Sequence, residues 1–381
     1  MKFCQIIAYP DALLNSLHAA RPHLMDAPFK EHALELAIEA PVAADLWTTT
    51  LADSGHEAQL IVANDVVSQC KWAAEKLEAF KPRNKAEWMC ELVLEQLRKV
   101  KPDVLCLTAP ISFQQRLLEH LKHRPRHLIA WTGAAPLAKA EWKDFDLVIA
   151  PHEAGVRNAW KNGARDARVL RPGFPRAVAE AVFQEPIVYD VAYVGSWNPA
   201  EEKRNKRIAA LAKAAQRKDL PFKLGLFLDV PAGADLPPAV LKLNQGPRLG
   251  LARYKALSGA KLIVSEEPPA AEAGSLSHTI FEGTGLGVCT LAPGSDLLQA
   301  CFKPGTEIVT YSNGTDLIAR IDEYLAADAQ RTSIAKAGQE RCLTEHSLEA
   351  RMKELIAMLE NPPSKLSGLM RRVWHGTLGQ G

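Results

Sequence analysis

The chain has 381 residues, of which 47% are hydrophobic and 24% are charged, and 46 basic against 44 acidic side chains give a formal net charge of +2. This composition is ordinary for a globular protein. The near balance of charge argues against a nucleic-acid-binding protein, which usually carries a strong basic excess. The length exceeds what one ordinary hydrophobic core can hold, so two domains are expected.

Short runs rich in Val, Ile and Leu, most of them followed by a helical pattern, recur through the first half of the chain. This alternation is typical of parallel βα units. A helix is expected over Lys85–Val100, where Asn84 and Glu87 have the spacing of a capping box. The predicted strands are Phe3–Ala8, Gln59–Ala63, Asp103–Thr108, Leu128–Trp131, Leu147–Ala150 and Arg168–Leu170.

The same pattern begins again after Pro172 and Pro175, which places a domain boundary there. The expected domains are residues 1–174 and 175–362, each a mostly parallel sheet with helices on both faces, followed by a tail at 363–381. Two such domains would place their ligand beyond the carboxyl ends of the strands, in a cleft. The second set of predicted strands is Asp190–Val194, Lys223–Leu228, Lys261–Val264, Val288–Leu291 and Glu307–Thr310.

The segment Gly274–Gly287, GSLSHTIFEGTGLG, lies between two predicted strands and reads as a loop that enters a helix. Ser275, Ser277 and Thr279 place hydroxyl groups near the free amides of the helix start, where the helix dipole favours a phosphate. Glu282 would lie one turn further on, within reach of a ribose. In the alternative interpretation, Thr279 and Glu282 form a T-x-x-E capping box, and Glu282 only closes the helix start.

A second candidate for contact with phosphate follows the predicted strand Asp190–Val194. Gly195 would let the backbone approach a diphosphate closely, with Ser196 beside it. Arg204, in the run EEKRNKR, is a candidate for neutralising the leaving diphosphate. The alternative is that this run is a solvated helix face.

The run Ser277–Leu355 is similar to the carboxyl-terminal region of CgeB-like glycosyltransferases. The residues that carry the resemblance are Phe281-Glu282, the G-x-E-I step Gly305–Ile308, and the terminal H-[TS]-x-x-x-R pattern formed by His346-Ser347 and Arg351. The resemblance extends back to YDVAYVGSW, Tyr189–Trp197.

The resemblance implies a GT-B fold, in which two Rossmann-like domains face each other across a cleft. It also implies a nucleoside-diphosphate sugar as donor, held by the carboxyl-terminal domain, and no required metal or cofactor. Glu282 would bind the ribose hydroxyls. His278, also assigned to the donor site, stands where the family often has an arginine, and Gly274 replaces the first acid of an E-x7-E pattern, so the stereochemistry of transfer is not predicted.

The acceptor would lie on the amino-terminal domain, where two residues follow predicted strands and are candidates for the catalytic base. These are Asp11, which alternatively makes a turn, and His152, which alternatively starts a helix. Trp131 and Gly133 are candidates for acceptor contact, although a tryptophan at a strand end more often packs. The sequence Asp-Phe-Asp at Asp144–Asp146 has the form of a metal-binding DxD motif. It opens a predicted strand, whereas that motif should close one, so a metal site is not expected there.

The overall prediction is a glycosyltransferase acting on a glycan, lipid-linked or protein acceptor, in surface polysaccharide or glycoconjugate synthesis. The scattered cysteines show no metal-ligand spacing, and the apolar run that ends at Pro10 is too short for a signal peptide or a membrane span. These features predict a cytoplasmic protein without a zinc site, with the tail as a candidate for peripheral membrane contact. Two alternatives stay open: a nucleotide-sugar epimerase on the same fold, and a catalytically inactive nucleotide-binding protein.

Overall fold

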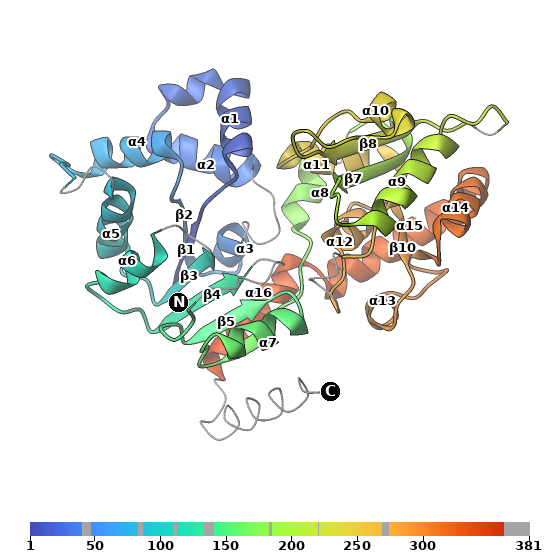
Figure 1. The fold of residues 1–381 in the computed structure, drawn as a ribbon. Coiled ribbons are helices and arrows are strands. Elements are labelled where there is room, and N and C mark those ends of the chain that lie inside the picture. Colours follow the sequence, from blue (N-terminus) through green and yellow to red (C-terminus); the bar gives the residue numbers. More distant parts are fainter. Residues whose placement is uncertain are drawn as a thin grey trace. The chain divides into compact units, whose positions relative to one another are not determined.

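The structure is a computed structural model, and it describes residues 1–39, 47–82, 87–109, 113–132, 141–182, 185–219, 221–268 and 274–361. Contacts between residues divide the chain into two compact units (Figure 1). One unit contains Met1–Arg171 together with the described residues from Arg351 on, and the other contains Pro172–Ala350. The last helix, α16 (Leu348–Glu360), therefore begins in the second unit and continues in the first.

The first unit is built on a parallel sheet with the strand order β2-β1-β3-β4-β5-β6. Every strand predicted for this half of the chain is present, and no end is shifted by more than two residues. The strands are β1 (Lys2–Ile7), β2 (Glu57–Val62), β3 (Val104–Ala109), β4 (His127–Thr132), β5 (Leu147–Ala150) and β6 (Ala167–Val169).

Helices cover both faces of this sheet, because successive strand residues point to opposite sides. Ile6 belongs to the core layer that contains residues of α5 (Trp88–Val100) and α7 (Glu153–Lys161). Its neighbour Ile7 belongs to the layer that contains residues of α1 (Asp11–Ala20) and α2 (Phe29–Glu39). The helices of this unit are α1 (Asp11–Ala20), the short 3₁₀ helix η1 (Pro22–Met25), α2 (Phe29–Glu39), α3 (Trp47–Asp53), α4 (Val66–Lys76), α5 (Trp88–Val100), α6 (Gln114–Glu119) and α7 (Glu153–Lys161).

The expected start of α5 was wrong. The helix begins at Trp88, and Glu87 occupies the cap position without a side-chain hydrogen bond to the helix start. Asn84, the other half of the expected capping box, lies outside the described residues. The carboxylate of Glu87 forms an ion pair with Arg116 of α6.

The second unit is also a parallel sheet, with the strand order β11-β10-β9-β7-β8. The predicted strands are again present, as β7 (Tyr189–Ser196), β8 (Leu224–Asp229), β9 (Ala260–Val264), β10 (Cys289–Pro293) and β11 (Val309–Tyr311). Its helices are α8 (Arg176–Val182), α9 (Glu202–Ala214), α10 (Pro238–Leu243), α11 (Leu251–Ser258), α12 (His278–Gly285), α13 (Asp296–Cys301), α14 (Gly314–Ala326), α15 (Asp328–Glu345) and the first residues of α16.

Alternation along β7 divides the core of this unit into two layers. Val191 and Tyr193 belong to the layer that contains α9 and α14, and Ala192 and Val194 belong to the layer that contains α11. Because all the strands run in the same direction, the segments that follow β7, β9 and β10 leave the sheet at one common edge. None of the helices in the described part of the chain is long and apolar enough to cross a membrane.

Candidate functional site

The carboxyl edge of the second sheet carries a bidentate ion pair between Arg253 of α11 and Glu282 of α12. The Nε atom of Arg253 lies 2.9 and 3.0 Å from the two carboxylate oxygens, and one terminal nitrogen lies 2.6 Å from Oε2. The same terminal nitrogen donates to the hydroxyl of Thr279 at 3.0 Å. The side chains of Arg253 and Glu282 are 23% and 12% exposed, so water screens this pair only partly.

This pair decides against the capping-box interpretation of Glu282. The cap of α12 is Ser277, whose side chain accepts from the Thr279 amide at 3.3 Å, and Glu282 points to Arg253 instead. Desolvation lowers the pKa of Arg253, but the Glu282 carboxylate outweighs that effect and holds it above its ordinary value. A charged guanidinium is therefore fixed one turn from the helix start.

Two further arginines reach the same edge from α9, which follows β7. Arg204 is buried, donates to the Glu267 carbonyl at 3.1 Å, and has an Nε atom without a partner among the described residues. The expectation that its helix face is merely solvated is therefore wrong for Arg204. Arg207 donates through Nε at 2.7 Å to the carboxylate of Glu266, a buried residue just after β9.

The charges of these arginine and glutamate side chains affect the phenol of Tyr193. Its pKa is raised, first by desolvation and then by the charge of Glu266, while Arg204, Arg207 and Arg253 act in the opposite direction. Desolvation also raises the pKa of Glu266, against the pull of Arg207. Arg204 and Arg207 thus act on one buried acid, Glu266, and together with Arg253 they act on Tyr193 at the edge where β7 and β9 end.

Gly195 lies in a different place from the one expected. It lies inside β7, where it pairs with Leu228, and not in a loop after the strand. A Cβ atom at this position would stand 2.9 Å from a ring carbon of Tyr193, so the glycine makes room for that ring. Ser196, the last residue of β7, is exposed.

The remaining side chains predicted near the start of α12 are partly exposed. Ser277 caps the helix, and His278 is its first residue. Desolvation lowers the pKa of His278, Glu282 raises it and Arg253 lowers it, so that the net shift is downward. His278 is therefore mostly neutral at pH 7, and Arg253 supplies a positive charge nearby. The hydroxyl of Ser275 is buried and has no partner among the described residues.

Some of the residues that carry the family resemblance pack against α12 or lie in it. The ring of His346 packs against Phe281 and Phe302, with centroid separations of 5.6 and 5.0 Å, and its Nε2 contacts the Cys301 carbonyl at 3.0 Å. The helix ends at Gly285, and Gly287 takes a φ of 72°, as expected for a glycine that follows a helix.

The candidates in the first unit have local structural partners. His152 is buried and caps α7, because its Nδ1 accepts from the Gly155 amide at 3.0 Å. Trp131 is buried at the end of β4, with its ring against Trp47. Asp11 is exposed at the first turn of α1. Gly133 lies outside the described residues, as does the tail at 363–381.

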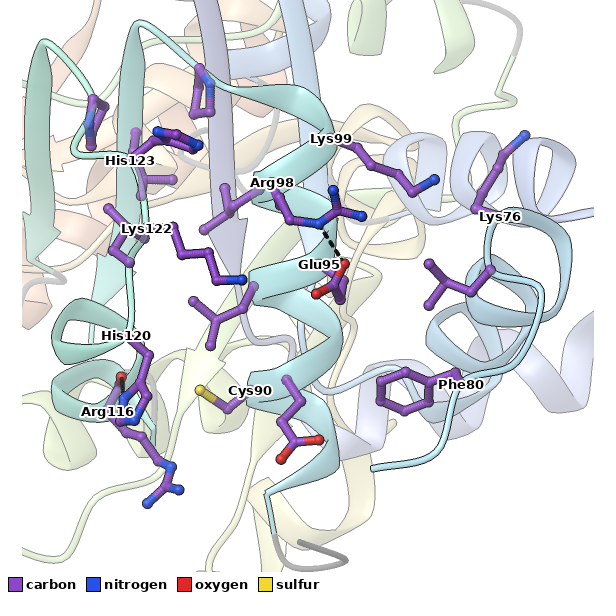
Figure 2. Close-up of a pocket in the computed structure, with 18 of the residues that line it drawn as sticks. Lys76, Phe80, Cys90, Glu95, Arg98, Lys99, Arg116, His120, Lys122 and His123 are labelled. Atoms are coloured by element: carbon purple, nitrogen blue, oxygen red, sulfur yellow. Dashed lines mark hydrogen bonds and ion pairs between the residues drawn. The ribbon is translucent and has the colours of Figure 1, made fainter. Parts of the chain in front are cut away.

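A cavity of about 870 Å³ lies elsewhere, on both sides of α5. Figure 2 shows α5 between α6 with its following loop and the end of α4, with basic side chains such as Arg98 and Lys122 along the walls. The lining includes Pro102 and Pro125, which precede β3 and β4. The cavity thus reaches the amino edge of the sheet, where parallel sheets do not usually bind their ligands, and it contains none of the residues predicted as site residues.

Sequence reasoning missed Arg253, Arg207 and Glu266. Arg253 and Glu282 are 29 positions apart, and no local spacing joins them. Glu266 follows a predicted strand, which is a weak signal. Its burial and its pairing with Arg207 depend on how α9 packs against the sheet.

Comparisons with known proteins find one family model that matches part of the chain. Residues 229–357, about a third of the chain, match the model of a family described as glycosyl transferase-like. The match includes α11 and α12. None of the curated proteins compared with the chain matches it.

Solved structures share the fold over almost the whole chain. HepE from Anabaena, in complex with UDP and glucose, is 12% identical with a TM-score of 0.55, and the match covers 94% of this chain and 100% of that one. Sucrose-phosphate synthase from Thermosynechococcus elongatus (11%, TM-score 0.52) and a glycosyltransferase from Rickettsia africae (13%, TM-score 0.52) both match over 94% of this chain and 98% of their own. The chain therefore has the GT-B glycosyltransferase fold.

Proposed function

We propose that the protein is a GT-B glycosyltransferase that takes its sugar from a nucleoside-diphosphate donor. The observation that carries the proposal is the group of three arginines, Arg204, Arg207 and Arg253, at the carboxyl edge of the second sheet, with Arg253 bound to Glu282 beside the start of α12. Ligands of open parallel sheets bind at this edge. A diphosphate is an anion that guanidinium groups and a helix start both favour.

The proposed role of the second unit follows from the chemistry of sugar transfer. As the bond to the sugar breaks, the diphosphate gains negative charge, and fixed positive groups stabilise that charge without reorganising. The second unit would hold the donor in this way, with Glu282 accepting from the ribose hydroxyls through oxygen lone pairs that Arg253 leaves free. The charge comes from the chain itself, so we propose transfer without a metal at this site.

We place the acceptor on the first unit and retain Asp11 as the candidate base, because it is exposed and follows β1. His152 is the weaker candidate, since its Nδ1 is occupied by the cap of α7. The CgeB-like subfamily, a cytoplasmic location and a role in glycoconjugate synthesis belong to the proposal as well.

The first test is a thermal-shift screen of nucleoside diphosphates and their sugars against the full chain. UDP is the leading candidate, because HepE, which shares the fold, binds UDP. Specific binding stabilises the folded state by RT ln(1 + c/Kd), where c is the ligand concentration, so the melting temperature rises with the logarithm of c once that exceeds Kd. Nucleotide release from the stabilising donor would then be measured with a panel of glycan acceptors. Binding without turnover would indicate an inactive nucleotide-binding protein, and sugar interconversion without an acceptor would indicate an epimerase.

A further inference from the structure

A group of three side chains in the first unit lies away from the proposed donor site. His18 comes from the last turn of α1, His32 from the first turn of α2, and Asp65 from the cap position of α4. The Nε2 atom of His32 lies 3.1 Å from Oδ2 of Asp65, and the Nε2 atom of His18 lies 3.4 Å from Oδ1. The two Nε2 atoms are 3.3 Å apart.

The hydrogen bonds around this group fix where its protons are. The Nδ1 atom of His32 contacts the Leu24 carbonyl at 3.3 Å, and a carbonyl only accepts, so Nδ1 carries the hydrogen. In a neutral ring, Nε2 of His32 then presents a lone pair to the carboxylate of Asp65. The His32 and Asp65 side chains are 0% and 1% exposed, so water does not separate these two acceptors.

Two arrangements relieve this conflict. In the first, His32 carries a second proton and is a buried imidazolium, with the ammonium of Lys71 close by, 2.6 Å from the same Leu24 carbonyl. This arrangement is a buried ion pair with Asp65, and desolvating both charges costs free energy. In the second, a metal cation lies between the three ligand atoms and takes the lone pairs of both rings. His32 then has the usual form of a metal ligand, with its other ring nitrogen donating to a backbone carbonyl.

The distances suit the second arrangement. Ligand atoms about 2.0 to 2.2 Å from a tetrahedral zinc ion lie about 3.4 Å from each other. The two Nε2 atoms are 3.3 Å apart, and they lie 3.1 and 3.4 Å from different oxygens of the Asp65 carboxylate. The carboxylate of Asp65 is oriented in turn by the Ser68 amide at 3.1 Å.

We propose that His18, His32 and Asp65 bind a divalent transition-metal ion, most favourably Zn²⁺. Two imidazoles and one carboxylate suit zinc better than calcium or magnesium, which prefer all-oxygen sites. The fourth coordination position opens beside His18, the only one of the three with appreciable exposure, at 19%. The ion would join α1, α2 and the start of α4, and would act on the stability of the first unit and not in sugar transfer.

Sequence spacing gives no sign of this site, because its ligands are separated by 14 and 33 positions and no cysteine takes part. The expectation of no zinc site rested on the scattered cysteines. The three side chains meet only because the helices that follow β1 and β2 pack together, as the shared core of α1 and α2 with Val62 shows.

The test is equilibrium dialysis of the full chain, without a histidine tag, against Zn²⁺ after treatment with a chelator, with bound metal measured by mass spectrometry. The proposal expects one tightly bound zinc ion per chain and a rise in melting temperature. His18→Ala should weaken zinc affinity about 100-fold or more and keep the fold, since this ring is partly exposed. The matched control is His23→Ala, which removes an exposed histidine of η1 and should bind zinc as the wild type does.

A second measurement needs no variant. Co²⁺ bound in place of Zn²⁺ should give the visible absorption of a tetrahedral site with nitrogen and oxygen ligands, without a sulfur charge-transfer band. A sulfur band would locate the metal on a cysteine, such as the exposed Cys70, and would overturn the proposal. Absence of stoichiometric zinc in the wild type, or equal affinity in His18→Ala, would overturn it as well and would favour the imidazolium arrangement.

Discussion

At the residue scale, the ion pair between Arg253 and Glu282 gives one carboxylate two roles. It neutralises a guanidinium that is three-quarters buried, and it stands where the donor's ribose is proposed to bind. A substitution of Glu282 therefore changes folding and binding together. Separating the two effects requires a variant in which the charge of Arg253 is removed as well.

We expect Glu282→Gln to lower the free energy of unfolding by about 2 kcal/mol, because it leaves Arg253 without its counter-charge. Nucleotide affinity should fall about 10- to 100-fold, which corresponds to one lost charge-assisted hydrogen bond. Chemical denaturation and calorimetric titration would measure the two quantities.

The control for this prediction is the double variant Arg253→Met with Glu282→Leu. Replacing a paired charge by apolar groups of similar size often restores stability, so this variant should regain most of the lost free energy and still bind nucleotide weakly. Wild-type affinity in the double variant would show that the pair is structural only.

The sequence predicted that several residues of the proposed donor site lie at the start of one helix, but not how they pair. Ser277, Thr279 and Glu282 were expected to be close together because they lie within one turn and a half of a helix. Arg253 was not expected, because only the packing of α11 beside α12 brings it there. Local spacing shows which side chains share a helix, and long-range packing decides which charge neutralises which.

At the element scale, the position of α12 depends on a close approach between the helix and the segment before α8. A Cβ atom at Gly285 would lie 2.2 Å from the ring of Phe174, which is fully buried and bridged to Ser347. We expect Gly285→Ala to cost about 1 to 3 kcal/mol of stability through overpacking. Thermal unfolding would measure it, with Gly294→Ala as a control, since a Cβ atom there meets nothing closer than 3.9 Å. Equal small effects in both variants would contradict this account.

Asp190 links three strands of the second sheet, and its contribution to the free energy of unfolding depends on pH. Its carboxylate accepts from the Lys223 amide at 2.8 Å and pairs with Lys261 at 2.7 Å. Desolvation raises the pKa of Asp190, but these two contacts outweigh it and lower the pKa below its ordinary value. The contribution is therefore fully present above the unfolded-state pKa of about 3.9, and it is lost as the pH falls through the lower folded-state pKa.

Asp190→Asn should accordingly lower the free energy of unfolding by about 1 kcal/mol at pH 7, and the difference from the wild type should shrink in acid. Urea unfolding at neutral and acidic pH would measure the difference. An equal difference in the free energy of unfolding at both pH values would show that the asparagine side chain destabilises the protein through packing and not through loss of charge.

Every strand of both sheets could be predicted, because buried parallel strands are continuous apolar runs with little ambiguity. The starts of helices were harder to predict from the sequence. Glu87 makes no side-chain cap at the start of α5 and pairs with Arg116, a residue 29 positions away, which local patterns cannot indicate.

At the scale of the whole molecule, the two sheets have separate cores and separate sets of charged residues. The arginines of the proposed donor site belong to the second unit, and the proposed metal ligands belong to the first. The account therefore predicts that the two sites can be removed independently. His18→Ala should leave nucleotide affinity unchanged, and Glu282→Gln should leave zinc binding unchanged.

The most direct test of the donor site is hydrogen–deuterium exchange of the full chain with and without a saturating nucleoside diphosphate such as UDP. Binding at the proposed site should slow exchange in peptides that cover residues 195–207 and 274–287, because the bound ligand orders the segments that follow β7 and β9. Protection confined to other regions, such as the cavity around α5, would contradict the assignment of this edge as the donor site.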